Sequence, residues 1–350
     1  KKDFYPFLKH INNNYDFVEL MSEILGELNV SHSGAGMRSN GKSGDVTAYF
    51  GLLFDVNYDG DGLLIDEVLE KGPFDKNHSK VKAGNIIEKI DGVEILSDMD
   101  YYPLLNKKVG KQVLVSVYNP DTRKRWEEIV KPISLGAQNE LLYQRWIKHN
   151  AEVVDSLSNG TLGYVHIRSM GDASYRDVYA DILGKYNRRK GVVIDTRFNG
   201  GGRLHEDIEI LFSGEKYLEQ VIRDSVACVM PSRRYVKPSI MITCEANYSN
   251  AHGTPWVYKH KKIGKLVGMP VPGTMSSVTW ETLQDTDLYF GLPVVGYRTQ
   301  EGYYLENYQL EPDVKVRNTP EKLAVGVDEQ LEAAVKELLK DVENYGYWGE

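Results

Sequence analysis

Short apolar strands alternate with amphipathic helices in the second half of the chain, from about residue 134 onward. Residues 191–194 and 240–242 are continuous apolar runs, which are typical of strands buried on both faces of a sheet. The expected strands cover residues 161–168, 191–195, 239–243 and 265–268. The expected helices cover residues 173–186, 206–212, 251–260 and 331–339. This order predicts a βαβ-type sheet, so residues 134–350 should form an α/β domain.

Residues 46–133 have the composition of a small β module, with short runs rich in β-branched and aromatic residues. The expected strands cover residues 46–54, 62–68, 113–118 and 125–130. The sequence KAGNIIEKIDGV at residues 82–93 predicts two strands joined by a tight Asp-Gly turn. This pattern resembles the central hairpin of a PDZ domain. The resemblance implies a helix at residues 98–106 and a carboxylate-binding loop at residues 51–54.

The beginning of the chain differs from both of these regions. Residues 1–30 carry apolar side chains at helical spacing, with Asn13 or Asn14 as the candidate cap at the start of the helix. Residues 31–44 are rich in glycine and serine and are expected to form a loop. The predicted fold class is therefore α/β and multi-domain. Its parts are a helical segment at 1–45, a PDZ-like domain at 46–133 and an α/β domain at 134–350.

Composition excludes several classes of protein. The net charge of −8 argues against a nucleic-acid partner. Two cysteines cannot make a disulfide framework, and both Cys228 and Cys244 lie in apolar runs that favour buried free thiols. None of the eight histidines has a partner at helical metal-ligand spacing, so neither a metal nor another cofactor is expected. No apolar run approaches the length of a membrane span.

A glycine-rich segment, Asn199-Gly200-Gly201-Gly202, follows the predicted buried strand at residues 191–195. Such a segment offers backbone N–H groups that can stabilise an oxyanion as it develops. Its spacing matches neither the P-loop nor the dinucleotide-binding fingerprint. A simple turn is the alternative explanation, because glycine suits many turns.

Polar residues elsewhere complete the set of candidates. Ser249 lies between a predicted buried strand and a predicted helix, where a hydroxyl can be presented at the edge of a sheet. A helix cap is the simpler explanation for this serine. His32 directly follows Ser31 and precedes the glycine-rich loop. Glu306 lies among aromatic and apolar neighbours, and a buried carboxylate there would need a partner.

These segments together resemble the tricorn-like and C-terminal-processing serine peptidases. The matching segments, in chain order, are LGELNVSHSG at 25–34, the PDZ-like insert, DTRFNGGG at 195–202, NYSNA at 247–251, KLVGMPVPGT at 265–274 and LENYQLEPDV at 305–314. The resemblance implies a tetrad, with Ser249 as nucleophile, His32 as general base, and Ser31 and Glu306 orienting the imidazole. It further implies an oxyanion hole made by the backbone N–H of Asn250 and one N–H from Gly201 or Gly202.

The sequence departs from the family pattern at four positions. Thr274 stands where the processing peptidases have a lysine base, which favours the histidine tetrad over a Ser-Lys dyad. Tyr248 replaces a small residue, Asn250 an aspartate and His252 a glutamate. Asn250 would contribute only its backbone N–H, so that change is expected to be tolerated. Tyr248 and His252 are expected to reshape the pocket.

The resemblance also implies substrates and partners. The expected substrates are peptides or unfolded polypeptides, cleaved in the cytoplasm, or in the periplasm or cell envelope if a signal peptide was removed. A homo-oligomer is expected, as is an N-terminal β-propeller region that this sequence lacks. The alternative function is a catalytically silent PDZ-type scaffold that binds C-terminal carboxylates. A non-peptidase acyl hydrolase or a small-molecule binder has no positive support, and the G-x-S-x-G motif of ordinary esterases is missing.

Overall fold

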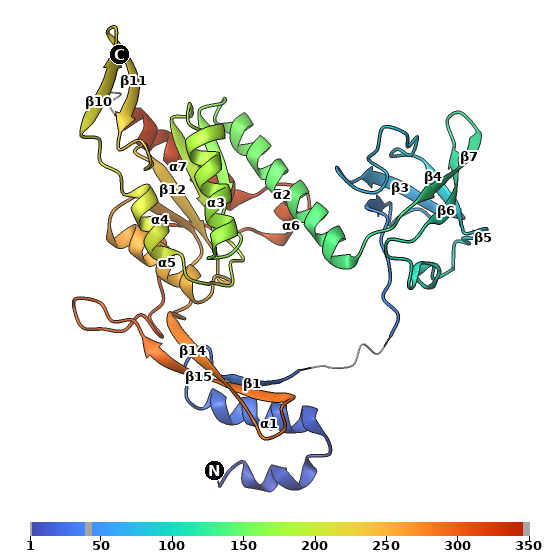
Figure 1. Ribbon diagram of the computed structural model, residues 1–350, viewed down its shortest axis with the longest axis horizontal. Helices are drawn as coiled ribbons and strands as arrows, with labels where there is room; N and C mark the ends of the chain where they lie inside the picture. The colour runs from blue at the N-terminus through green and yellow to red at the C-terminus, as the bar shows by residue number, and fades with distance from the viewer. Residues whose placement is uncertain (1, 39–43, 346–350) are drawn as a thin grey trace. The chain divides into compact units, whose positions relative to one another are not determined.

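The computed structural model describes residues 2–38 and 44–345, which form two compact units (Figure 1). One unit combines residues 1–40 with residues 150–350, and the other consists of residues 41–149. The first unit therefore takes its chain from both ends of the sequence, and the second is an insertion between them.

The inserted unit is built on an antiparallel sheet with strand order β2-β3-β4-β6-β7, and β5 pairs with β4. Its strands are β2 (Leu52–Phe54), β3 (Leu63–Val68), β4 (Ile86–Ile90), β5 (Val93–Glu94), β6 (Val113–Asn119) and β7 (Lys124–Val130). Asp91 and Gly92 join β4 to β5, and both have positive φ, at 49° and 82°. Because such tight turns require positive φ, the predicted Asp-Gly hairpin is confirmed.

Two predictions for this unit were wrong. The helix expected at 98–106 is only a single 3-10 turn, η2 (Tyr102–Leu105). Pro103 lies in that turn and Asp100 Oδ1 accepts the N–H of Tyr102 at 3.1 Å, so local bonding competes with a longer helix. The strand expected at 46–54 shortens to β2, since Gly51 takes a φ of 69° that interrupts it.

Helix α2 (Leu135–Leu157) was not identified from the sequence. Charged residues interrupt the spacing of its apolar side chains, and two of these charged residues bind acidic residues in or next to β3. Arg145 pairs with Glu67 at 2.7 Å and Lys148 with Glu70 at 2.7 Å. These long-range ion pairs attach the first part of the helix to the inserted unit. The helix was missed because such pairs leave no regular apolar spacing in the sequence.

The larger unit contains the predicted α/β sheet. All neighbours in the strand order β16-β13-β12-β9-β8 run parallel. The strands are β8 (Leu162–His166), β9 (Gly191–Asp195), β12 (Ser239–Thr243), β13 (Lys265–Gly268) and β16 (Val314–Lys315). The helices are α3 (Asp172–Ala180), which continues as the π-helical turn η3 (Asp181–Lys185), α4 (His205–Phe212), α5 (Asn250–His260), α6 (Pro320–Leu323) and α7 (Glu329–Asn344).

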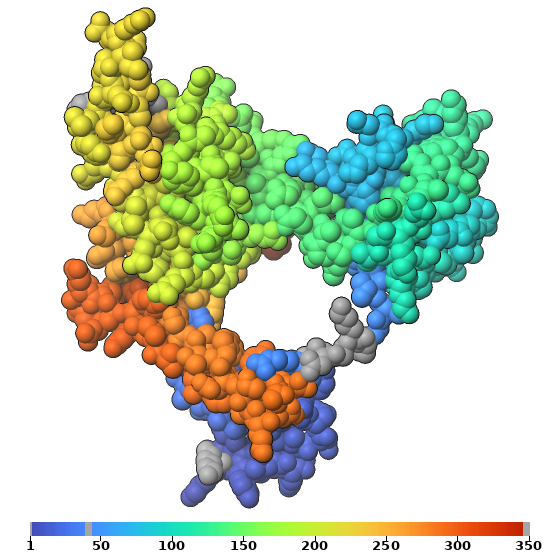
Figure 2. Space-filling model, viewed as in Figure 1, coloured from blue at the N-terminus to red at the C-terminus, as the bar shows by residue number. Residues whose placement is uncertain are grey.

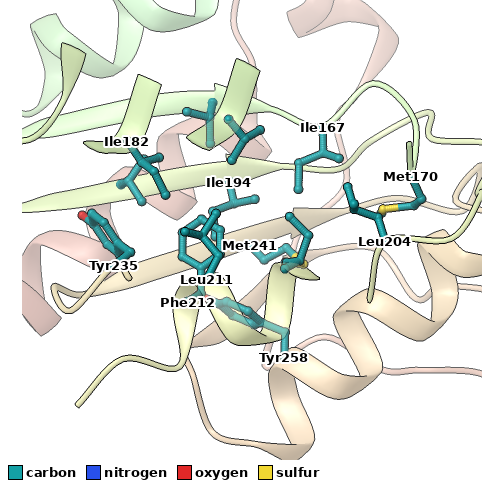
Figure 3. Packing of buried hydrophobic residues seen from close by; sticks show 14 of the residues in the cluster. Ile167, Met170, Ile182, Ile194, Leu204, Leu211, Phe212, Tyr235, Met241 and Tyr258 are labelled. Atoms are coloured by element: carbon teal, nitrogen blue, oxygen red, sulfur yellow. The ribbon is translucent and has the colours of Figure 1, made fainter. Parts of the chain in front are cut away.

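Helices cover both faces of this sheet, as its continuous apolar strands require. On one face Ile194 and Met241 pack against Leu211 and Phe212 of α4 and Tyr258 of α5 (Figure 3). On the other face α7 contacts β9, β12 and β13, and its buried side chains include Leu331 and Leu338. The carboxyl ends of β9 and β12 are thereby fixed, and the loops that follow them start from a rigid edge.

The N-terminal residues add a second, antiparallel sheet to the larger unit. The turn η1 (Tyr5–His10) precedes α1 (Asn14–Gly26), and α1 is capped by Asn13, whose side chain accepts the N–H of Asp16 at 3.0 Å. Strand β1 (Gly34–Met37) pairs with β15 (Leu288–Gly296), which pairs with β14 (Ser276–Thr282). Figure 1 shows α1 lying along this sheet.

Strand β1 corrects the expectation of a continuous loop at 31–44. Gly36 is needed for packing rather than for turning, because a side chain there would collide with Tyr289 of β15. Residues 39–43 of the expected loop lie outside the described residues.

A hairpin of β10 (Leu218–Ile222) and β11 (Ser225–Met230) projects from the larger unit (Figure 2). Both cysteines are free thiols. Cys244 is buried as predicted, whereas Cys228 is only half-buried because it lies on this projecting hairpin. Within the described residues, no helix is both long enough and apolar enough to span a membrane.

Candidate active site

Ser249 occupies the turn between β12 and α5, where the sequence placed it. Its φ of 57° and ψ of −123° are unusual for a residue with a side chain, so the turn is strained. It stands at the N-cap position of α5, yet its side chain makes no capping hydrogen bond. The backbone N–H donates instead to Thr274 Oγ1 at 2.9 Å. A strained serine whose side chain makes no capping hydrogen bond is more typical of a functional residue than of a structural helix cap.

The glycine-rich loop after β9 lies directly against this turn. A side-chain carbon added at Gly201 would lie 2.6 Å from Ser249 Cβ and 3.1 Å from the nitrogen of Asn250. The N–H of Gly201 itself donates to Asn199 Oδ1 at 2.8 Å. Among the described residues, the N–H groups of Gly202 and Asn250 have no acceptor. The N–H of Asn250 directly follows Ser249 at the positive end of α5, and that of Gly202 directly follows Gly201, which packs against Ser249.

His32 is bound to a cluster of polar side chains through one of its ring nitrogens. Ser31 Oγ lies 2.8 Å from His32 Nδ1 and donates to Glu306 Oε2 at 2.9 Å. The N–H of Ser31 donates to the other carboxylate oxygen of Glu306 at 2.6 Å. Ser276 Oγ lies 3.0 Å from the same His32 Nδ1. The structure thus joins Ser31, His32 and Glu306, although 275 residues separate the first from the last.

Tyr248 links the histidine to the loop that carries Ser249. Its hydroxyl accepts the N–H of His32 at 2.7 Å, and the two rings lie 4.7 Å apart. His32 has a φ of 61°, so this contact holds a residue in a conformation that L side chains rarely adopt. Within the described chain, no hydrogen bond joins His32 to Ser249 directly. Tyr248 was singled out only as a residue that reshapes the pocket, and its contact with His32 had no signal in the sequence.

Burial lowers the pKa of His32 below its ordinary value, against an opposing effect of the nearby Glu306 charge. The imidazole is therefore neutral near pH 7, as a general base must be before it accepts a proton.

The remaining departures from the family pattern have structural roles. Asn250 Oδ1 accepts the N–H groups of Leu204 and His205, at 2.8 Å and 3.1 Å, and so holds the start of α4. His252 is fully buried, and in the described part of the chain neither of its ring nitrogens has a hydrogen-bond partner. Burial lowers the pKa of His252 to about 4, so this histidine is neutral and serves as a packed core residue.

Open space adjoins Ser31 and Glu306. A pocket of about 380 Å³ is lined by Ser31, Tyr248, Thr274 and Glu306, among others. No group of three or more His, Cys, Asp or Glu residues among those described could hold a metal ion.

Comparisons with known proteins show which family this sequence resembles. The sequence model of peptidase family S41 matches residues 161–316. Tricorn protease of Thermoplasma volcanium is 26% identical over 95% of this chain and 32% of its own length. Tricorn protease homolog 1 of Streptomyces coelicolor is 25% identical over 97% of this chain and 32% of its own length. The chain spans about a third of the length of these curated relatives.

A solved structure shows the same fold. The crystal structure of the tricorn protease superposes with a TM-score of 0.86 at 22% identity, covering 98% of this chain and 34% of that one. The predicted class, an α/β fold with a separate antiparallel β module, is confirmed. Residues 161–316 thus match peptidase family S41. The chain as a whole is similar to tricorn protease over nearly its full length.

Proposed function

We propose that this chain hydrolyses peptide bonds with Ser249 as nucleophile and His32 as general base. His32 Nε2 would take the proton of the Ser249 hydroxyl as Oγ attacks the peptide carbonyl, and would then give that proton to the leaving amine. The N–H groups of Asn250 and Gly202 would stabilise the oxyanion of the tetrahedral intermediate. Water, deprotonated by His32, would then release the acyl group.

The observation that carries this proposal is the chain of contacts from His32 Nδ1 through Ser31 to Glu306. The Ser31 Oγ atom lies 2.8 Å from the imidazole and 2.9 Å from the carboxylate. Such a relay orients the ring and stabilises the imidazolium that forms when the base accepts a proton. A catalytically silent scaffold would not require a serine that connects a histidine ring to a carboxylate by hydrogen bonds.

The alternative function, capture of C-terminal carboxylates by the inserted unit, is weakened by one contact. A carboxylate-binding loop must offer free backbone N–H groups. The N–H of Gly51, at the start of the expected loop, donates to the side chain of Gln138 at 3.1 Å, and Gln138 is buried. A ligand carboxylate would have to displace this internal acceptor.

The substrates, assembly and location follow from the resemblance and remain part of the proposal. We expect peptides or unfolded chains as substrates, a homo-oligomer, and action in the cytoplasm together with a β-propeller region. The curated relatives are about three times as long as the segment they share with this chain. The activity of the isolated chain is therefore a property to be measured.

The direct test is covalent labelling with a fluorophosphonate probe, followed by mass spectrometry of the labelled peptide. We expect labelling at Ser249 in the native sequence and none in Ser249→Ala or His32→Ala. Ser97→Ala is the matched control, because Ser97 is exposed in the inserted unit. Labelling of His32→Ala at the native rate would contradict the role of His32, and no labelling of any variant would favour the silent scaffold.

Changing Glu306 to glutamine should reduce kcat less than changing His32 to alanine, because glutamine keeps the shape but loses the charge. The Glu306 charge raises the pKa of His32, so the variant should have a lower His32 pKa. The active form has a neutral His32. The acidic limb of kcat/KM, already below pH 6.5, should therefore move to lower pH, as measured by pH-rate profiles of the native protein and the variant. Glu311→Gln, an exposed neighbour, is the control; an unmoved limb would argue against an electrostatic role for Glu306.

A further inference from the structure

Ser276 is a second serine at the histidine, and the tetrad does not include it. It is the first residue of β14 and only 4% of it is exposed. Its Oγ lies 3.0 Å from His32 Nδ1 and 2.9 Å from Ser31 Oγ. Its backbone N–H donates to the carbonyl of Thr274, whose hydroxyl accepts the N–H of Ser249. One short segment therefore contacts the backbone of the proposed nucleophile and the side chain of the proposed base.

The protons in this cluster can be assigned one at a time. The Glu306 carboxylate can only accept, so the single hydroxyl proton of Ser31 belongs to the Ser31–Glu306 bond. The 2.8 Å contact between Ser31 Oγ and His32 Nδ1 then needs a proton from the imidazole. Nδ1 therefore carries the proton, and Nε2 has the free lone pair that a general base requires.

The proton of Ser276 follows from the same count. Its 2.9 Å contact with Ser31 Oγ also needs a proton, and that of Ser31 is already used. Ser276 therefore donates to Ser31 and turns a lone pair towards Nδ1–H. If Ser276 donated to Nδ1 instead, Nε2 would carry the proton, and Ser31 Oγ would face Nδ1 with no proton between them.

We propose that Ser276 is a positioning residue that holds His32 in the Nδ1–H tautomer and provides a second acceptor for its imidazolium. This inference rests on the proposed peptidase function, since the tautomer matters only if His32 acts as a base. It differs from the role of Ser31, because Ser276 does not contact the carboxylate. Its contribution is a second acceptor for Nδ1–H, which adds to the preference for this tautomer that the Ser31–Glu306 bond already sets.

Removing the Ser276 hydroxyl should destabilise the imidazolium form of His32 more than its neutral form. Ser276→Ala removes one acceptor from Nδ1–H and one donor to Ser31, and hydrogen bonds to charged groups are stronger than neutral ones. We expect kcat to fall about tenfold, as for one hydrogen bond to a charged group, with KM little changed. If the Ser276 hydroxyl had only a structural role, its removal would leave the pKa of His32 unchanged.

The experiment is a titration of the full chain labelled with ¹⁵N-histidine, in a Ser249→Ala background that requires no turnover. The His32 signal is assigned by its loss in His32→Ala. With Ser276→Ala we expect the His32 pKa to fall by about half a unit, since a group that stabilises the charged form is lost. The Nδ1–H tautomer should also lose population. Ser276→Thr, which restores a hydroxyl, should recover both values.

Ser277→Ala is the matched control, because Ser277 Oγ lies 3.1 Å from the Tyr297 hydroxyl and has no contact with the histidine. If Ser276→Ala does not fold, Ser276→Cys keeps the volume with a weaker hydrogen-bonding group and should shift the titration in the same direction. An unchanged His32 pKa and tautomer in a folded variant would overturn the proposal. Failure of the native protein to react with the fluorophosphonate would count against the peptidase alone, because the titration is read without catalysis.

Discussion

Replacing Ser249 with alanine should reduce peptide turnover by roughly a millionfold, the loss seen when the nucleophile of such a catalytic unit is removed. Within the described part of the chain, two hydroxyls close to the Ser249 turn and to His32 are already engaged elsewhere. Thr274 Oγ1 is occupied by the N–H of Ser249, and Ser31 Oγ by the carboxylate of Glu306. The variant would keep its backbone donors and its substrate contacts. These alone are worth about 10³- to 10⁴-fold over the reaction in water.

The double variant Ser249→Ala/His32→Ala makes this test sharper. Residues that act as one unit are not additive, so the double variant should be no slower than either single variant. Single-turnover and steady-state hydrolysis of an unstructured fluorogenic peptide would measure all three rates, with Ser97→Ala as the control. A Ser249→Ala rate within tenfold of the native rate, or a double variant slower by a further thousandfold, would contradict the assignment of these two residues.

The α/β sheet was predictable because its signals are local. Residues 191–195 and 239–243 are apolar and short, and the structure has strands β9 and β12 at those positions. The turn that holds Ser249 and the glycine loop follow these strands directly in the sequence. Parallel strands bring their carboxyl ends to one edge, so the sequence alone places these two loops near each other.

The other half of the site could not be predicted from local pattern. Strand β1 is glycine-rich and resembles a loop, and it becomes a strand only by pairing with β15, more than 250 residues away. The contacts of His32 with Tyr248 and Ser276 span 216 and 244 residues. Pairings of that kind are decided by tertiary packing, on which helix and strand periodicity carry no information.

The site therefore lies between two sheets of the larger unit, and each sheet positions different residues of the site. The parallel sheet, covered by helices on both faces, holds Ser249 and the free N–H groups on short loops. The antiparallel sheet of β1, β15 and β14 holds His32 and Ser276. The Glu306 segment connects them, since the N–H of Asn307 donates to the carbonyl of Gly273 at 2.8 Å, and Val271 pairs with Leu310 beside β13. Tyr248 adds a direct contact between the Ser249 turn and His32.

The glycine loop depends in turn on a buried ion cluster beneath it. Arg197 is 2% exposed and Asp195 is fully buried. The guanidinium donates to both carboxylate oxygens of Asp195, at 2.6 Å from Nη2 and 3.0 Å from Nε, and also to Asp328 at 2.7 Å. Asp328 caps α7 by accepting the N–H of Leu331. The loop is thus joined to the helix on the far face of the sheet.

Replacing Arg197 with methionine should lower the free energy of unfolding of the larger unit by about 3–5 kcal/mol, the cost of leaving a buried charge without its partner. Asp195 would lose its cationic partner in a site closed to water, and Asp328 would lose one of its contacts. Amide hydrogen exchange of peptides covering β9 and β12 would report this loss for the unit directly.

Two further variants decide the cause. Lys340→Met removes a pair with Glu337 in which the lysine is 54% exposed, so it should cost less than about 1 kcal/mol. The double variant Asp195→Asn/Arg197→Met removes both charges and should recover part of the stability, because desolvation of an unpaired carboxylate is then avoided. If Arg197→Met lost no more than Lys340→Met, the cluster would have no strong role in stability. If the double variant were less stable than Arg197→Met, packing and hydrogen bonds, rather than unpaired charge, would account for the loss.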